Sequence, residues 1–159
     1  MARVAAAVAR ALELPLHRQP EGGSHRREAG RIALERPDEV AKKAPLDERT
    51  FVVVMTHNFL RDKDYVRSLL SSPARFIAML GPAVRTERLL TELREEGVDI
   101  PEDDRARIRG PAGLDLGAEG AEEIAAAIVA EIVAVKRGRG AGFLKDRSGP
   151  IHERHAPAR

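Results

Sequence analysis

Thr56, His57 and Asn58 form the first group of residues in this 159-residue sequence that could do chemistry. They follow an apolar run and offer a hydroxyl, an imidazole and an amide to a ligand. An imidazole can hydrogen-bond an anion or relay a proton near neutral pH. His57 could therefore contact a bound phosphate, or it could cap the turn at the end of a strand. The sequence leaves both roles open.

The second group runs from Gly110 to Gly117 and combines glycines with one carboxylate. Gly110, Gly113 and Gly117 could adopt positive φ and let the backbone approach a ligand closely, while Asp115 could bind a ribose hydroxyl. The alternative is a tight structural turn in which Asp115 accepts hydrogen bonds from backbone amides. A helix predicted from Ala121 onward would direct the positive end of its dipole toward an anion held in this loop.

Other reactive patterns are weak. The sequence has no cysteine, which excludes disulfides, thiolate catalysis and cysteine-bound metal within this chain. His152 and His155 are spaced like metal ligands but have no third ligand beside them, so we expect no metal site. No serine, histidine and aspartate fall in a catalytic order. We therefore expect no catalytic residue.

Two apolar runs predict the strands that must position these residues. Thr50–Met55 and Arg75–Leu80 lack polar alternation, which is typical of strands covered on both faces. Helical periodicity follows each run, over 62–70 and 84–96. The order strand, helix, strand, helix predicts parallel pairing. Gly81 then lies beside Thr56 at the carboxyl edge of the sheet, where such sheets bind ligands.

The remaining segments are assigned from periodicity, proline and glycine. Arg3–Leu14 repeats apolar residues at helical spacing, which predicts a helix that Pro15 ends. Ala121–Arg137 is the most regular amphipathic helix, acidic at its start and basic at its end as the helix dipole favours. Short turns or helices are expected from Pro37 and Pro101, a loop over 17–31, and a flexible tail over 138–159.

Composition and charge limit which partners and which cellular location we expect for the protein. The formal net charge is only +2, and the few aromatic residues are not interleaved with basic ones, so we expect no nucleic-acid partner. No segment approaches the roughly 18 consecutive apolar residues of a membrane span, and Met1–Leu14 lacks the apolar run of a signal peptide. These features indicate a cytoplasmic globular protein without a membrane partner.

Three stretches together resemble the XdhC/CoxI family, the accessory proteins that mature molybdenum-cofactor enzymes such as xanthine dehydrogenase. They are Val-Val-Met-Thr-His at 53–57, the strand end Ile-Ala-Met-Leu-Gly at 77–81, and the loop Gly-Pro-Ala-Gly-Leu-Asp-Leu-Gly at 110–117 before Glu-Glu-Ile-Ala at 122–125. Their order and spacing agree with the family over about Thr50–Arg137, and the third stretch is the most specific.

The sequence also departs from the family. The family's Gly-Ala-Gly-His-Val-Ala turn has no counterpart in this sequence. The backbone amides that would bind a pyrophosphate at this turn are therefore missing as well. Met1–Ala5 looks like the start of the helix that follows that turn, and Gly81-Pro82 replaces the usual Gly-Ser. The family's amino-terminal domain has no counterpart either. We therefore expect an α/β fold, an incomplete Rossmann-like three-layer domain over 1–137 with a short parallel sheet flanked by helices.

The resemblance implies an accessory protein that binds the molybdenum cofactor, molybdopterin, and aids its sulfuration or its insertion into a molybdoenzyme of the xanthine dehydrogenase or carbon monoxide dehydrogenase type. Such a cofactor-insertion chaperone would not itself be an enzyme. The implied cofactor-binding residues are Thr56, His57, Asn58, Gly81, Gly110, Gly113, Asp115 and Gly117.

Two alternatives stay open. The first is an NAD(P)-linked oxidoreductase domain, which the missing glycine motif disfavours. The second is a non-catalytic interaction module, in which an exposed sheet edge pairs with a second copy or with a separately encoded amino-terminal half.

Overall fold

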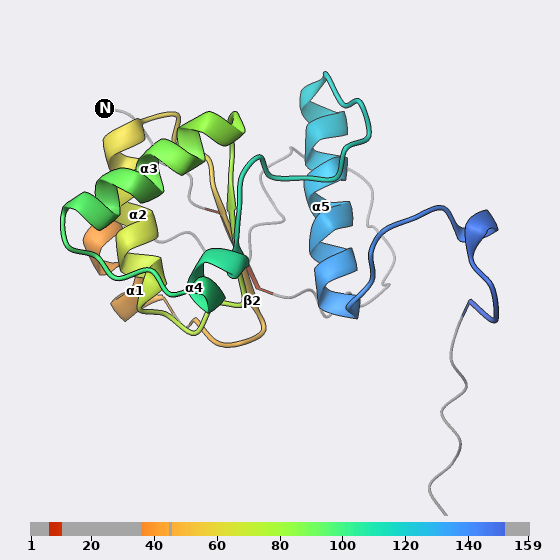
Figure 1. The fold of residues 1–159 in the computed structure, drawn as a ribbon, viewed down its shortest axis with the longest axis horizontal. Helices are drawn as coiled ribbons and strands as arrows, with labels where there is room; N and C mark the ends of the chain where they lie inside the picture. The colour runs from red at the N-terminus through yellow and green to blue at the C-terminus, as the bar shows by residue number, and fades with distance from the viewer. Residues whose placement is uncertain (1–6, 11–35, 45, 152–159) are drawn as a thin grey trace, which may run out of the picture. The chain divides into compact units, whose positions relative to one another are not determined.

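The computed structural model describes residues 7–10, 36–44 and 46–151. The chain divides into two compact units, residues 1–112 and 113–159. The domain expected over 1–137 stays a prediction. The first unit holds the sheet and most of the helices (Figure 1).

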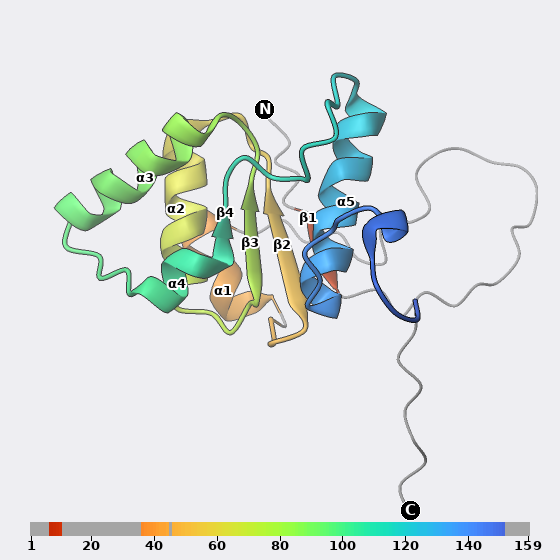
Figure 2. The same cartoon turned by 45° about the vertical axis from the view of Figure 1, so that its right-hand side comes forward.

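The sheet has four strands, three of which run parallel. In order across the sheet they are β1 (Ala7–Arg10), β2 (Thr50–Val54), β3 (Phe76–Met79) and β4 (Ile108–Arg109). β2, β3 and β4 are parallel, and β1 pairs with β2 in the antiparallel sense (Figure 2). The predicted α/β, Rossmann-like fold with a short parallel sheet flanked by helices is confirmed.

Two helices cover one face of this sheet, α2 (Phe59–Leu70) and α3 (Ala83–Glu95), as Figure 1 shows. The side chains of Val52, Val54, Ile77 and Met79 enter a buried apolar core with residues of both helices. From the helices come Tyr65, Val66, Leu69, Leu89, Leu90 and Leu93. Because each fully buried aliphatic side chain contributes roughly 1.5–3 kcal/mol, this core fixes how the two helices lie on the strands.

Residues on the other face of β2 and β3 are buried as well. Phe51, Val53, Phe76 and Ala78 are all nearly inaccessible to solvent. The rings of Phe51 and Phe76 lie 5.7 Å apart between centroids in a tilted arrangement, a geometry that aromatic pairs favour. The absence of polar alternation in both runs therefore correctly predicted strands buried on both faces.

The helix boundaries follow local signals. Asn58 caps α2, since its side chain accepts a hydrogen bond from the Arg61 amide. Gly97 follows α3 with φ of 83°, as expected for a glycine at that position. Short helices occur where proline predicted them, over Pro37–Glu39, Val40–Lys43 (α1) and Glu102–Arg107 (α4).

Two strands of the sheet, β1 and β4, differ from what the sequence predicted. The helix predicted over Arg3–Leu14 is wrong where the structure describes it, because Ala7–Arg10 is a strand. The unpaired amides and carbonyls on the outer edge of β2 bind this segment, and that tertiary pairing outweighs a weak helical preference. The edge invoked for the interaction module is thus occupied by the chain itself. β4 was not predicted, because two residues carry no detectable period.

The second unit is built on one long helix, α5 (Ala121–Arg137), with the bounds that the sequence predicted. Gly138 ends it in the left-handed conformation, with φ of 62°. Beyond α5, a 3-10 turn at Leu144–Asp146 lies in a largely exposed segment that is described to Ile151. Within the described parts of the chain, no helix is long and apolar enough to cross a membrane.

Candidate functional site

The carboxyl ends of the three parallel strands lie at one edge of the sheet. Hydrogen bonds continue past the strands there, since the Leu80 amide donates to the Val54 carbonyl at 3.0 Å and the Ala112 amide donates to the Met79 carbonyl at 2.9 Å. The structure therefore brings the turn after β2, Gly81 after β3, and Gly110 after β4 to the same edge. The sequence predicted this arrangement for Thr56–Asn58 and Gly81, whereas Gly110 was assigned to a loop without a preceding strand.

The turn after β2 is held by its own polar side chains. The Thr56 hydroxyl accepts a hydrogen bond from the Asn58 amide at 3.2 Å and donates to Asp62 Oδ1 at 2.5 Å. Between them, His57 adopts the left-handed conformation with φ of 57°, which is uncommon for a residue other than glycine. Thr56 and Asn58 thus shape the turn, while the imidazole of His57 is exposed at the edge.

A buried ion pair links this turn to the start of α3. The Asp62 side chain is only 3% exposed, and its Oδ2 accepts from Arg85 Nη2 at 2.6 Å, whereas the Arg85 side chain is 27% exposed. Arg85 also lies over the ring of Phe59, 5.5 Å from its centroid. One carboxylate therefore contacts both Thr56 and Arg85 and joins two of the strand-end segments.

Sequence reasoning missed Asp62 and Arg85, although one signal was present. Asp62 falls on the same helical face as Tyr65, Val66 and Leu69, which are all buried. A carboxylate within an apolar helical stripe requires a partner, because a buried charge without one is strongly disfavoured. That partner lies 23 residues further along the chain, and no local pattern identifies it.

The two edge glycines have different requirements. Gly81 has φ of 110°, and a Cβ atom there would lie 3.2 Å from Arg85 Cδ. A Cβ atom at Gly110 would lie 2.1 Å from the buried Thr86 hydroxyl. The close approach expected at Gly110 is therefore an approach to α3, and it explains the glycine without a ligand.

The other three predicted residues, Gly113, Asp115 and Gly117, belong to the second unit. Gly113 has φ of 108°, its amide donates to Glu131 Oε2 at 2.7 Å, and a Cβ atom there would lie 3.2 Å from that of Ala127. Positive φ at Gly113 and Gly117 is as predicted. Asp115 is exposed, and none of the described residues donates a hydrogen bond to its carboxylate.

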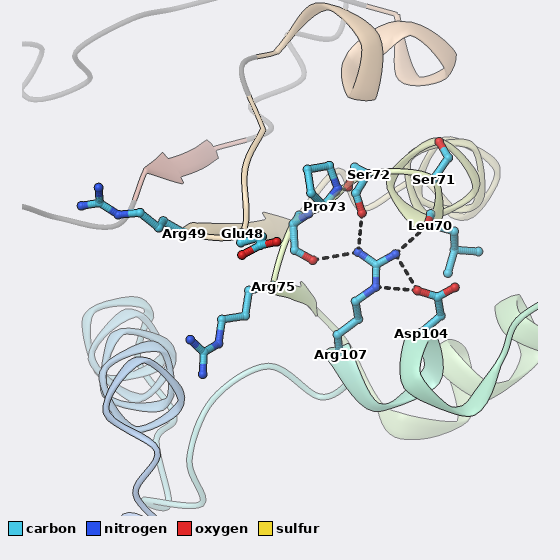
Figure 3. Close-up of a pocket in the computed structure, with 10 residues that line it drawn as sticks. Glu48, Arg49, Leu70, Ser71, Ser72, Pro73, Arg75, Asp104 and Arg107 are labelled. Carbon is cyan, nitrogen blue, oxygen red and sulfur yellow. Dashed lines mark hydrogen bonds and ion pairs between the residues drawn. The ribbon is translucent and has the colours of Figure 1, made fainter.

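A shallow hollow of about 840 Å³ lies at the opposite edge of the sheet, among residues that precede β2 and β3. Its wall includes Arg107, whose guanidinium donates to the carbonyls of Leu70 at 2.6 Å and Ala74 at 2.7 Å and pairs with Asp104 at 2.8 Å (Figure 3). The Leu70 carbonyl belongs to the last residue of α2 and has no donor within the helix, whereas Ala74 lies in the segment that leads into β3. Arg107 is therefore part of the scaffold.

Metal-ligating groups do not converge in the part of the chain that the structure describes. No cluster there contains three or more histidine, aspartate or glutamate side chains able to hold an ion. His152 and His155 lie outside the described residues. The chemistry available at the carboxyl edge is that of hydrogen-bond donors and cations, which suits an anionic ligand.

Comparison with known proteins agrees with this fold. The family model of the XdhC Rossmann domain matches residues 2–132, which span both compact units. An uncharacterized protein, YqeB, of Escherichia coli strain K12 is 33% identical over 100 residues, covering 63% of this chain and 18% of that protein. A protein of Bacillus subtilis strain 168 that is named as a probable xanthine dehydrogenase subunit is 34% identical over 101 residues, covering 64% of this chain and 28% of that protein.

A solved structure shows the same similarity. The crystal structure of a xanthine dehydrogenase from Bacillus halodurans has a TM-score of 0.57 and 33% sequence identity, covering 71% of this chain and 31% of that one. The chain thus spans less than a third of the length of these three proteins.

Proposed function

The chain belongs to the family of XdhC Rossmann domains, and from this membership we propose that it is an accessory protein in the maturation of a molybdenum-cofactor enzyme. The partner we propose is a molybdoenzyme of the xanthine dehydrogenase or carbon monoxide dehydrogenase type, because two similar proteins carry xanthine dehydrogenase in their names. In this proposal the chain binds the cofactor and aids its sulfuration or insertion.

The observation that carries the proposal is the carboxyl edge of the sheet. Here an exposed imidazole, a partly exposed guanidinium and a glycine with positive φ occupy consecutive strand ends, at His57, Arg85 and Gly81. Open α/β sheets bind their ligands at this edge. Molybdopterin carries a phosphate, and cationic or neutral N–H donors are the groups that recognise phosphate. The residues at this edge therefore fit the group.

The chain's own residues would hold and orient the ligand. His57 and Arg85 would donate to its phosphate, and Gly81 leaves backbone accessible because it has no side chain. Thr56 and Asp62 keep both donors in place, since the Asp62 carboxylate contacts Thr56 and Arg85 at once. Asp115 of the second unit is a separate candidate contact, because its exposed carboxylate can accept from the amino group of a pterin. When bound, the cofactor supplies the redox chemistry of the enzyme that receives it.

Cofactor retention tests this function. The purified chain is incubated with molybdopterin released from a molybdoenzyme and passed through a desalting column, and the pterin retained per protein is measured by fluorescence after oxidation. We expect His57→Ala and Asp115→Asn each to reduce retention severalfold without changing the melting temperature. Thr91→Ala, at an exposed position of α3, is the matched control. Absence of retention in the unsubstituted chain, or equal retention in all three variants, would contradict the proposal.

A second pair of variants separates fold from binding in the Gly110–Gly117 loop. Gly113→Val places a β-branched side chain at a positive φ and against Ala127, so it should lower the melting temperature. Asp115→Asn removes only charge and should keep stability within about 0.5 kcal/mol, the usual scale for surface positions. If Asp115→Asn instead lowers the melting temperature and leaves retention per folded molecule unchanged, Asp115 is a turn residue and not a ligand contact.

A further inference from the structure

Helix α5 carries an exposed apolar stripe. Val129 and Val133 are each 52% exposed, and Ala126 is exposed one turn before them. The stripe begins at Glu122 and ends at Lys136. Successive residues along it are alternately four and three positions apart, which is the spacing at which helices pair. All five side chains are exposed, so α5 presents a helix-pairing face to solvent along its length.

The charges on this face are arranged symmetrically about its centre. Glu122 and Lys136 each lie seven residues from Val129, and α5 is acidic in its first turn and basic in its last. If two copies of α5 lie antiparallel with Val129 at their crossing point, Glu122 of one copy faces Lys136 of the other. A parallel pair would instead place like charges together, which is unfavourable. The face is therefore complementary to itself in only one direction.

We propose that α5 is a self-association surface that pairs two copies of this chain antiparallel about Val129. A two-fold axis makes each copy use the same patch, so that one set of residues supplies both halves of the contact. The seam from Glu122 to Lys136 is only about 21 Å long at 1.5 Å per residue, so the dimer is weak. The proposed pairing of two copies does not depend on cofactor binding.

Single cysteines test the register, because the natural sequence contains none. Val129→Cys places a thiol at the proposed axis, where two copies bring their helices together. Glu122→Cys is the matched control at another exposed position of α5, because the two thiols would lie about 21 Å apart in the antiparallel pair. This separation is far beyond the roughly 7 Å between Cα atoms that a disulfide allows. After mild oxidation of the full chain at high concentration, we expect covalent dimer from Val129→Cys at least five times more abundant than from Glu122→Cys.

A charge exchange in the Val129→Cys background tests the direction of pairing. Glu122→Lys alone should reduce the covalent dimer severalfold, and adding Lys136→Glu should restore it, because the exchanged charges again face one another across the seam. Helicity of every variant is followed by circular dichroism, so that loss of α5 is distinguished from loss of pairing. Equal dimer yields from both cysteine variants, no dimer from either, or no recovery in the exchanged variant would overturn the proposal.

Discussion

Arg85 and Arg88 lie over the same ring, that of Phe59, but only Arg85 reaches the buried carboxylate of Asp62. Replacing Arg85 with methionine leaves that carboxylate without its cation, and breaking a buried pair on one side costs on the order of 3 kcal/mol. Arg88→Met removes an exposed guanidinium from the same ring, and we expect it to cost less than about 1 kcal/mol. Urea unfolding of the two variants measures both free energies, and equal losses would show that Arg85 acts through the ring alone.

At the scale of single residues, the sequence predicted positions better than roles. Thr56, His57 and Asn58 lie at the strand end where they were expected, but Thr56 and Asn58 use their side chains to shape the turn. Glycine is required at position 110 because a Cβ atom there would collide with the Thr86 side chain. Asp62 and Arg85 could not be paired in advance, because their contact joins two helices and depends on how those helices pack.

At the scale of elements, Arg107 connects α4 to the end of α2. Its guanidinium donates to the carbonyl of Leu70, the last residue of α2, and to that of Ala74 before β3, and its side chain is 14% exposed. We expect Arg107→Met to lower the free energy of unfolding by about 2–4 kcal/mol, because several buried carbonyls lose their donors together. Arg94→Met, at an exposed position of α3, should change it by less than about 0.5 kcal/mol. Chemical denaturation compares the two, and a similar small effect from both would contradict the role of Arg107 in capping.

A second contact between elements makes stability depend on pH. Lys63 Nζ lies 2.7 Å from Glu96 Oε1 and 3.0 Å from Glu92 Oε2, joining α2 to α3. Its hydrogen bonds to Glu96 and Glu92 raise the pKa of Lys63 above 10.5, and the hydrogen bond from Lys63 lowers the pKa of Glu92 below 4.5.

The directions of these two pKa shifts define the pH range in which the contact stabilises the fold. The contribution of Glu92 is present above its unfolded-state pKa and is lost as pH falls through the lowered folded-state pKa. The contribution of Lys63 is complete below its unfolded-state pKa and is lost as pH rises through the raised one. The difference in melting temperature between the natural chain and Lys63→Met should therefore be largest between about pH 4.5 and 10.5 and shrink on either side. A difference in melting temperature that stays constant from about pH 3 to about pH 11 would contradict this expectation.

The elements themselves were largely predictable. β2, β3, α2, α3 and α5 follow from hydrophobic period, because each buries a regular set of apolar side chains. β1 was predicted as helix because the apolar residues of Arg3–Leu14 repeat at helical spacing, but Ala7–Arg10 takes its conformation from the edge of β2. Local sequence cannot report a partner strand 40 residues away, as Arg10 is from Thr50.

At the scale of the whole molecule, we expect very weak binding of nicotinamide dinucleotides. The sequence contains no Gly-x-Gly-x-x-Gly turn, and this turn brings backbone amides to the pyrophosphate in dinucleotide-binding folds. Isothermal calorimetry with NAD and NADP measures the affinity directly. Dissociation constants in the low micromolar range would contradict this expectation and favour an oxidoreductase domain.

The sheet in the first unit ends on short strands at both sides, with four residues in β1 and two in β4. Long, flat edges invite strand addition and lead toward amyloid-like stacking, and short edges are one way in which natural proteins resist it. Because β1 also occupies the edge of β2, few backbone groups of the described strands are left to template a foreign strand. The sheet is thus protected against aggregation by its own short edge strands, and contacts between copies fall to side-chain surfaces such as that of α5.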